Sequence, residues 1–417
     1  MKNVEQEVKS WIEKKIIYIA FIAIFLLGIA VRIMLRKFVS RDAQIFLLPW
    51  YEEIKSNGGI SGLGKQVGNY NLLYQFFIAI FTYLPVNPLY LYKIFSIIFD
   101  IALAIMGGIW TKNIWKKNAL ECFLIFGCIF MSPVVILNSS FWAQCDSIYC
   151  FFCIVTLYLI FQKKYWLAMF FWGAAFSFKL QAVFILPMIM LMYIKNKDFP
   201  LKKFVGSIVS IVCLALPGIL NGRNILDILK IYFGQVSGDA DSIFYNYPGI
   251  CNIFINADSV SDNRMYIKSL CLILAFCILG MFCVWVIYQK IEFTSYTFTF
   301  TAFILVYTAV IFLPGMHERY GYVYEILAIL IMIYDKRTMF LSIALQLCTV
   351  ITYSSYLFQK GYNVTIMSII NFAIYLIYVW YYIVRLKKES ITSENTKKVL
   401  THFKAYSIMN FVDDVGS

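Results

Sequence analysis

Residues 16–35 read IIYIAFIAIFLLGIAVRIML, an apolar run long enough to cross the roughly 30 Å hydrocarbon core of a bilayer as one helix. Similar runs recur along the chain, in which 61% of the 417 residues are hydrophobic and only 14% are charged. A soluble globular domain of this size does not have that composition. The first run is too long for a signal peptide and has no small-residue cleavage site, so we expect it to remain as a helix. The sequence predicts an all-α, polytopic integral membrane protein.

Apolar length and periodicity predict twelve membrane-spanning helices. The stretch Asn71–Leu84 is left out because it is too short to cross the core and Pro85 and Pro88 close it, so we expect it to be interfacial or re-entrant. The stretch 165–194 is divided into two helices at Lys179, because a single span would bury that charge at about 2.5–3.5 kcal/mol. The predicted spans cover residues 16–35, 89–110, 119–137, 146–162, 165–177, 181–195, 203–219, 267–289, 295–313, 321–334, 338–357 and 363–385.

Basic residues gather in alternate loops of this arrangement, and short loops rich in Lys and Arg lie in the cytoplasm. We therefore expect both termini to be cytoplasmic in a multi-pass protein of the cell membrane. The net charge of +13 follows from these loops rather than from a nucleic-acid surface, since the basic residues do not share one amphipathic face. We expect one membrane domain over 1–417, in which a module at 16–219 is followed by an external loop at 220–266, further helices at 267–385 and a cytoplasmic tail at 386–417.

The same arrangement places five polar clusters on the external side. Because they share one face, they predict a single site at one membrane surface. The clusters are Arg41–Asp42, Trp142–Asp146, Lys179–Gln181, the loop 220–266 and His317–Arg319.

Asp42 in the first loop is a candidate general base, since a carboxylate at the membrane surface can take a proton from an attacking hydroxyl. The alternative is a solvated loop charge paired with Arg41. Farther along this loop, Pro49 suits the start of a helix, and Gly58 and Gly59 suit its end.

His317 and Arg319 stand beside the bilayer at a helix entrance, where a lipid-linked phosphate would need hydrogen-bond donors. Arg offers forked donors and His offers a donor near neutral pH. Ordinary interfacial anchoring is the alternative. His317 and Glu318 do not form a zinc motif, because no second His or Cys stands at ligand spacing.

Two further carboxylates have both a functional and a structural interpretation. Asp146, close to Gln144, begins a predicted helix, where the helix dipole by itself favours an acid. Asp100 lies near the centre of the second span, so it is a functional candidate, with a hydrogen bond between helices as the alternative. Lys93 is about 10 Å away from it along the helix axis, too far for a direct pair.

The loop 220–266 is rich in aromatic, amide and carboxylate side chains, which suit the ring faces and hydroxyls of carbohydrates. The same residue types make ordinary turns. They are Tyr232, Gln235, Asp239, Asp241, Tyr245–Gly249 and Asn252.

Taken together, these clusters resemble the GT-C superfamily of polyprenyl-phosphate-sugar-dependent glycosyltransferases. Within this superfamily, the chain resembles bacterial proteins similar to the second mannosyltransferase of GPI-anchor synthesis and the dolichyl-phosphate-glucose glucosyltransferases. The resemblance spans about residues 16–335 and depends on the order and membrane placement of short motifs. These are Asp42 ahead of Phe46–Trp50, Gly68–Asn71, Lys93 with Asp100, Trp142–Tyr149, Phe178–Gln181 with Pro187, and Met316–Tyr320.

The resemblance implies an inverting hexosyltransferase that moves mannose or glucose from a polyprenyl-phosphate donor to a lipid or glycan acceptor at the external face. Residues 16–219 would be its catalytic module, and 267–385 would complete the site. Asp42 would activate the acceptor hydroxyl. Many family members carry two acids in the first loop, whereas Arg41 precedes a single Asp42 here, so Asp146 stays as a second candidate for the base.

The resemblance also implies a set of donor-binding residues. His317 and Arg319, together with Lys179, would hold the donor phosphate. No nucleotide sugar is needed, and the sequence has no Gly-rich phosphate loop. The resemblance leaves open whether a divalent cation is required as a cofactor, and the sequence has no evident carboxylate cluster that would bind one. The remaining implied site residues are Gln144, Gln181, Asp100, Glu318 and Tyr320.

Three other classes of protein compete with this interpretation. A lipid-linked oligosaccharide flippase or other transporter would also have about twelve spans, but it should show internal repeats and a polar mid-membrane cavity. A surface-polysaccharide polymerase or ligase would be an enzyme acting on a lipid-linked oligosaccharide. A non-catalytic scaffold would leave the external clusters without an explanation.

Overall fold

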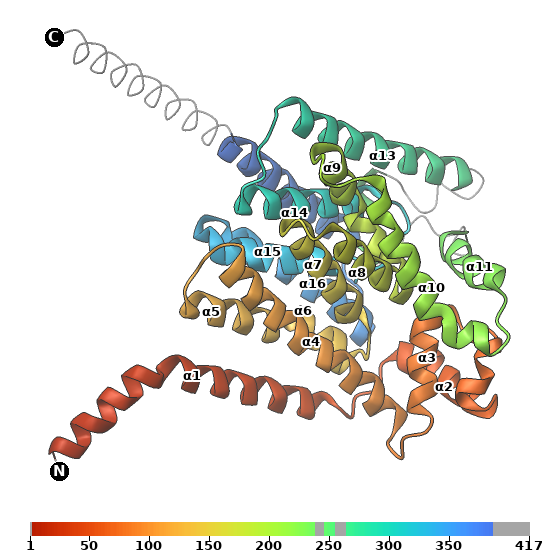
Figure 1. Ribbon diagram of the computed structural model, residues 1–417, viewed down its shortest axis with the longest axis horizontal. Helices are drawn as coiled ribbons and strands as arrows, with labels where there is room; N and C mark the ends of the chain where they lie inside the picture. The colour runs from red at the N-terminus through yellow and green to blue at the C-terminus, as the bar shows by residue number, and fades with distance from the viewer. Residues whose placement is uncertain (1, 238–245, 255–263, 387–417) are drawn as a thin grey trace, which may run out of the picture. The chain divides into compact units, whose positions relative to one another are not determined.

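The computed structural model describes residues 2–237, 246–254 and 264–386, and in these ranges the chain is helical and contains no strand. It divides into two compact units, Met1–Phe372 and Ala373–Ser417, and the first contains the candidate sites described below. In chain order the helices are α1 (Lys2–Leu35), α2 (Leu48–Ser56), α3 (Leu72–Phe81), α4 (Pro88–Asn113), α5 (Ala119–Phe130), α6 (Pro133–Ile136), α7 (Asp146–Phe161), α8 (Tyr165–Phe178), α9 (Leu186–Lys195), α10 (Val205–Leu220), α11 (Ile225–Ser237), α12 (Cys251–Phe254), α13 (Arg264–Tyr288), α14 (Ser295–Phe312), α15 (Tyr322–Tyr334) and α16 (Met339–Phe358), followed by a helix at Val364–Leu386 (Figure 1). Shorter helical turns are η1 (Ala43–Leu47), η2 (Gly59–Gly64), η3 (Leu137–Phe141), η4 (Leu180–Ile185), η5 (Leu201–Phe204) and η7 (Lys336–Thr338).

Seven helices in the described part of the chain are long and apolar enough to cross a membrane, and a bent pair makes up to eight. Five shorter apolar helices accompany them. This is the make-up of a multi-pass, all-α membrane protein. Among the short helices, α3 has only 10 residues, about 15 Å of helix, which agrees with the expectation that Asn71–Leu84 does not cross.

The bent pair corrects one predicted span. The stretch 119–137 is not one helix, because α5 stops at Phe130 and a second segment, Pro133–Phe141, follows at an angle of 44°. Ser132 has an extended ψ of 126°, as expected of a residue before a proline, and Pro133 itself lacks the N–H that would continue the α5 ladder.

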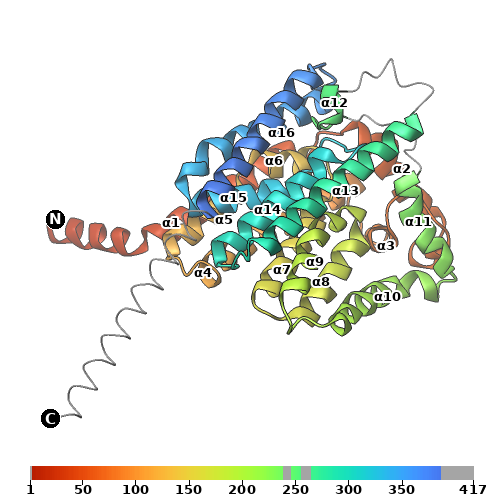
Figure 2. The same cartoon turned by 90° about the horizontal axis from the view of Figure 1, so that it is seen from above.

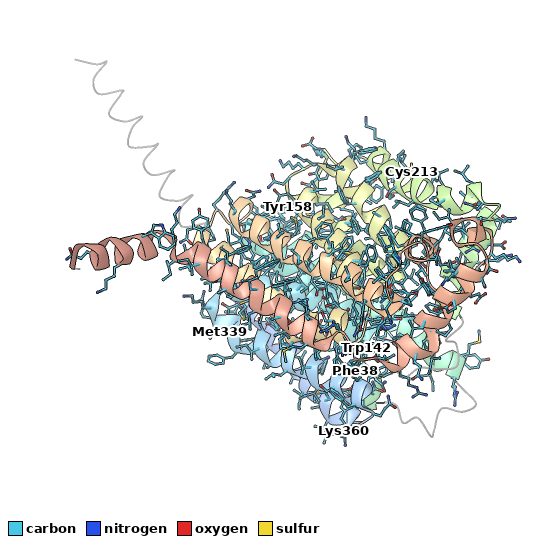
Figure 3. The ribbon with its side chains drawn as sticks, turned by 90° about the horizontal axis from the view of Figure 1, so that it is seen from below. Phe38, Trp142, Tyr158, Cys213, Met339 and Lys360 are labelled. Carbon is cyan, nitrogen blue, oxygen red and sulfur yellow. The ribbon has the colours of Figure 1, made fainter. Side chains whose placement is uncertain are left out.

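The first unit has two ends that matter for function. The helix α7 runs from Asp146 to Phe161, α8 packs against it, and the turn between them carries Lys163. We call these the Asp146 end and the Lys163 end. In Figure 3, Phe38 and Trp142 lie toward Lys360, which follows α16, and Tyr158 of α7 lies toward the opposite end.

The core is centred on α14, of which 94% of an 18-residue window is buried. It packs between α13 and α15 (Figure 2). The helices α8 and α10 approach each other closely at Gly173. A Cβ at this residue would stand 2.6 Å from the backbone oxygen of Ser207 in α10, so only glycine fits there.

A buried ion pair joins α1 to α4. Nε and Nη2 of Arg32 lie 3.2 and 3.1 Å from Oδ2 of Asp100, and the hydroxyl of Ser139 donates to the same oxygen at 2.6 Å. Lys93 does not join this group, as its distance along the helix predicted. It donates instead to the backbone carbonyls of Leu35, Arg36 and Phe38 and so caps the C-terminus of α1.

Candidate active site

Asp42 is a buried, oriented carboxylate where the chain turns after α1, with 8% of its surface exposed. Its Oδ2 accepts hydrogen bonds from Nε1 of Trp142 at 2.9 Å and Nε2 of Gln144 at 2.7 Å. Its Oδ1 accepts a hydrogen bond of 2.5 Å from the hydroxyl of Tyr356, in the last turn of α16. Hydrogen bonds to an ionised acceptor are short and strong, so three partners hold this carboxylate in one orientation.

Arg41 is not the partner of Asp42. Its Nη1 donates to Oε1 of Gln359 at 3.4 Å, and the residue is exposed. The alternative of a solvated loop pair between these neighbours therefore does not describe the folded chain.

A tight turn ahead of α7 presents Gln144 to the first loop. Ala143 has a φ of 65°, a left-handed conformation that costs a residue with a Cβ roughly 1–2 kcal/mol. The turn is held by the N–H of Gln144, which donates to the carbonyl of Asn138 at 2.9 Å, and by Ser96, whose hydroxyl donates to the carbonyl of Gln144 at 2.7 Å. Strain of this kind persists where the surrounding contacts fix the backbone.

Asp146 and Lys179 form a buried ion pair at the start of α7. Lys179 follows the end of α8 in an extended conformation, and α9 begins only after η4, so the break predicted at this lysine is present. Its Nζ donates to Oδ1 of Asp146, while Nδ2 of Asn138 donates to Oδ2 at 2.8 Å. The ammonium also lies 5.6 Å from the ring centroid of Tyr149 and 5.9 Å from that of Tyr320.

Arg319 connects the two carboxylates. Its Nη1 is 3.6 Å from Oδ2 of Asp42, and its Nε is 3.8 Å from Oδ2 of Asp146. The guanidinium lies over Trp142, 5.7 Å from the ring centroid. Two carboxylates and two cations thus form one network, assembled from the first loop, the start of α7, the end of α8 and the α14–α15 loop.

Burial changes the protonation of the neighbours of Arg319. Burial, and then the charges of Arg319 and Lys179, lower the pKa of His317 to about 3, so its imidazole is neutral near pH 7 and donates from one nitrogen only. Burial also raises the pKa of the Glu318 carboxyl, although Arg319 opposes that effect. The positive charge of the site therefore resides on Arg319 and Lys179.

Several buried polar atoms at or beside this network have no hydrogen-bond partner within the described ranges. They include Nε of Arg319, Oε2 of Glu318 and Oε1 of Gln181, the second residue of the turn η4 that follows Lys179. Buried polar atoms are nearly always satisfied in folded proteins. An unsatisfied donor and two unsatisfied acceptors beside one charge network are what a site for a polar ligand requires.

Asp100 does not join this group of residues. Its partners are Arg32 and Ser139, and it carries out the structural role that was the alternative in the sequence, a polar contact between helices. Asp100 is linked to the network through the backbone: its partner Ser139 directly follows Asn138, which donates to Asp146.

Part of the loop 220–266 packs beside the first loop. Tyr232 of α11 stacks on Phe176 at a centroid distance of 4.5 Å, and Nε2 of Gln235 donates to Oδ1 of Asn71 at 3.0 Å. Tyr247 is 3% exposed and has an internal structural position. The candidate residues Asp239, Asp241 and Tyr245, like the tail 387–417, lie outside the described residues.

Three further side chains at the site were not singled out in the sequence. Asn138 and Tyr356 contact the two carboxylates directly, and Tyr70 donates to Oε1 of Gln144 at 3.0 Å. Asn138, eight residues before Asp146, follows a proline-containing stretch that could have suggested a broken helix. The motif Gly68–Asn71 brackets Tyr70, but no local pattern points to Tyr356.

Within the described ranges, no group of three or more His, Cys, Asp and Glu side chains is placed to hold a metal ion. No protein-family model matches the chain, and no curated protein is significantly similar to it.

Proposed function

We propose that this chain is a membrane glycosyltransferase that transfers a hexose, mannose or glucose, from a polyprenyl-phosphate donor to the hydroxyl of a lipid or glycan acceptor, with inversion at the anomeric carbon. The observation that carries the proposal is the network in which Arg319 connects Asp42 to Asp146. It combines an oriented carboxylate, two cations and unsatisfied polar atoms at one end of a helical membrane protein.

Asp42 is the better candidate for the base. Both oxygens of Asp146 are occupied by Lys179 and Asn138, and this carboxylate is fully buried. Among the described residues, Oδ1 of Asp42 accepts a hydrogen bond only from the Tyr356 hydroxyl, so its second lone pair is left for an acceptor hydroxyl. Asp146 then has a positioning role, since it orients the two cations.

The donor phosphate is assigned to Arg319, His317 and Lys179. The Nε of Arg319 is available as a donor, and a neutral His317 can add a second donor without adding charge. Pre-oriented donors of this kind stabilise the negative charge that develops on a leaving phosphate. Oε2 of Glu318 and Oε1 of Gln181 are acceptors suited to sugar hydroxyls.

In the proposed step, the acceptor oxygen attacks the anomeric carbon as its proton passes to Oδ1 of Asp42. The bond between the anomeric carbon and the phosphate oxygen breaks, and its electron pair leaves with polyprenyl phosphate. The products are the glycosylated acceptor and the lipid phosphate, and the proton on Asp42 is released to solvent.

The proposed topology has twelve spans, both termini in the cytoplasm and the Asp146 end outside. The seven long helices and the bent pair account for eight spans, and four of the five shorter apolar helices, all except α3, would supply the others. Helices of 13 to 16 residues need local thinning of the bilayer to cross it.

The test is transfer from polyprenyl-phosphate hexoses by the purified chain in vesicles. Asp42→Asn keeps the shape of the side chain and should lower the rate by about 10²–10⁴-fold, the usual contribution of a general base. Asp227→Asn is the matched control, because Asp227 is an exposed carboxylate of α11 that pairs with Lys230 on the same helix. Full activity of a folded Asp42→Asn protein would remove Asp42 as the base. Lipid-linked sugar that crosses the bilayer without transfer would favour a flippase.

A further inference from the structure

A cavity of about 500 Å³ opens at the Lys163 end, opposite the candidate active site. Its walls come from the ends of α7, α9 and α13 and from the segment that leads into α14. Phe161 and Met192 provide apolar wall, and Lys163, Lys195 and Lys290 surround it with ammonium groups. It shares no residue with the network of Asp42 and Asp146.

The charge of this cavity is predominantly positive. Its three lysines face one acid, Glu292. Lys195 is fixed in place, because its Nζ donates to the carbonyl of Ile291 and lies 4.7 Å from the ring centroid of Phe293. The other two lysines are exposed, so their ammonium groups can reach a ligand in the cavity.

Lys163 and Lys290 both occupy strained backbone positions. Their φ values are 57° and 50°, in the left-handed region that glycine or asparagine usually fills after a helix. A lysine there costs roughly 1–2 kcal/mol of backbone strain. Two lysines held in this conformation at the lining of one cavity indicate that their side chains have a role there.

An apolar stripe on α13 leads to the cavity. Met281, Val284 and Tyr288 are exposed and stand three and four residues apart, so they share one face of the helix. Ile287, in the last turn of α13, and Lys290 and Ile291 just after the helix line the cavity itself. A molecule with a charged group in the cavity can therefore lay a hydrocarbon chain along α13.

We propose that this cavity binds the phosphate headgroup of an anionic phospholipid, with an acyl chain on the α13 stripe. Basic pockets between membrane helices recognise such headgroups, and a free phosphate would make no use of the apolar stripe. The site is independent of the proposed sugar transfer, and the lipid would hold the ends of α7, α9 and α13 together.

The experiment measures lipid retained by the full-length protein in nanodiscs of phosphatidylcholine doped with phosphatidylglycerol, by native mass spectrometry after release. The variant is Lys163→Gln with Lys290→Gln. Each lysine contributes about a fivefold gain in affinity for an anionic surface, so removal of both should lower the affinity roughly 25-fold. The matched control is Lys112→Gln with Lys116→Gln, which removes the same charge near the end of α4 and includes a third left-handed lysine, with φ of 56°.

Selective loss of phosphatidylglycerol in the cavity variant alone is the expected result. Equal retention by the cavity variant and the wild type would overturn the proposal and leave these lysines as helix caps. If the wild type retained phosphatidylcholine to the same extent as phosphatidylglycerol, the cavity would not recognise the headgroup charge. Thermal stabilisation by inorganic phosphate equal to that by phosphatidylglycerol would replace the lipid with a soluble anion.

Discussion

The hydroxyl of Tyr356 donates a hydrogen bond of 2.5 Å to the carboxylate of Asp42, across 314 residues of sequence. The indole of Trp142 lies under the Tyr356 ring at a centroid distance of 4.9 Å and donates to the other oxygen of the same carboxylate. The helix α16 therefore orients the proposed base of the first loop, and an acceptor hydroxyl must bind beside this tyrosine.

Tyr356→Phe should lower kcat about 10-fold or more while KM for the donor stays the same. A hydrogen bond to a charged group contributes about 1.5–3 kcal/mol, and here it fixes the orientation of Asp42 rather than the donor. Steady-state transfer kinetics measure kcat and the donor KM separately. Tyr362→Phe is the control, because the hydroxyl of Tyr362 bonds to the carbonyl of Asn246 and not to Asp42. A rise in donor KM with unchanged kcat would place Tyr356 in donor binding instead.

The sequence predicted where two charged residues of the candidate active site lie, because the direction of successive helices alone decides their positions. Two successive helices joined by a short turn place Asp146, at the start of α7, and Lys179, after the end of α8, at one end of the pair, and both are there. The start of α2 was also predictable, because Pro49 occupies its first turn. Local chemistry was sufficient in each case.

Contacts between distant helices were not predictable from local pattern. Lys93 and Asp100 lie on one helix, so the sequence suggested considering them together. The partner of Asp100 is instead Arg32 on α1. Helix packing decides which charges meet, and neither periodicity nor spacing contains that information. For the same reason, the sequence did not indicate which of the 30 tyrosines would contact Asp42.

Arg319→Lys should reduce transfer about 100-fold even though the charge is kept. Lysine offers a point charge and cannot reach both Asp42 and Asp146 with one planar fork, and the available Nε donor is lost. Arg41→Lys makes the same exchange at an exposed residue and should keep nearly full activity. Transfer rates at saturating acceptor, with donor concentration varied, measure the effect. Equal rates for the two variants would contradict the bridging role.

The ion pair between Arg32 and Asp100 should matter for folding rather than for transfer. Arg32→Met leaves an uncompensated buried carboxylate and should lower the free energy of unfolding by about 3–5 kcal/mol. Arg32→Met combined with Asp100→Leu should recover much of that loss. The cycle is measured by thermal unfolding in detergent, and transfer is expressed per folded molecule. A stable but inactive double variant would return Asp100 to the active site.

The low pKa of His317 predicts how stability changes with pH. The folded chain holds this imidazole neutral down to about pH 3, whereas the unfolded chain binds the proton near pH 6.5. The unfolded state therefore binds more protons between these values, so the stability from His317 is present above about pH 6.5 and is lost as the pH falls toward 3, by at most about 1.4 kcal/mol per pH unit.

His317→Gln should remove that part of the slope and leave the part due to carboxylates, which wild type and variant share. Unfolding midpoints from pH 4 to 7 in detergent give the difference between the two curves. The same variant should raise donor KM, since glutamine places its donor differently from the imidazole. Parallel stability curves would show that the pKa of His317 is the same in the folded and unfolded chain, about 6.5, and the donor phosphate would then meet a partly protonated imidazole rather than a neutral donor.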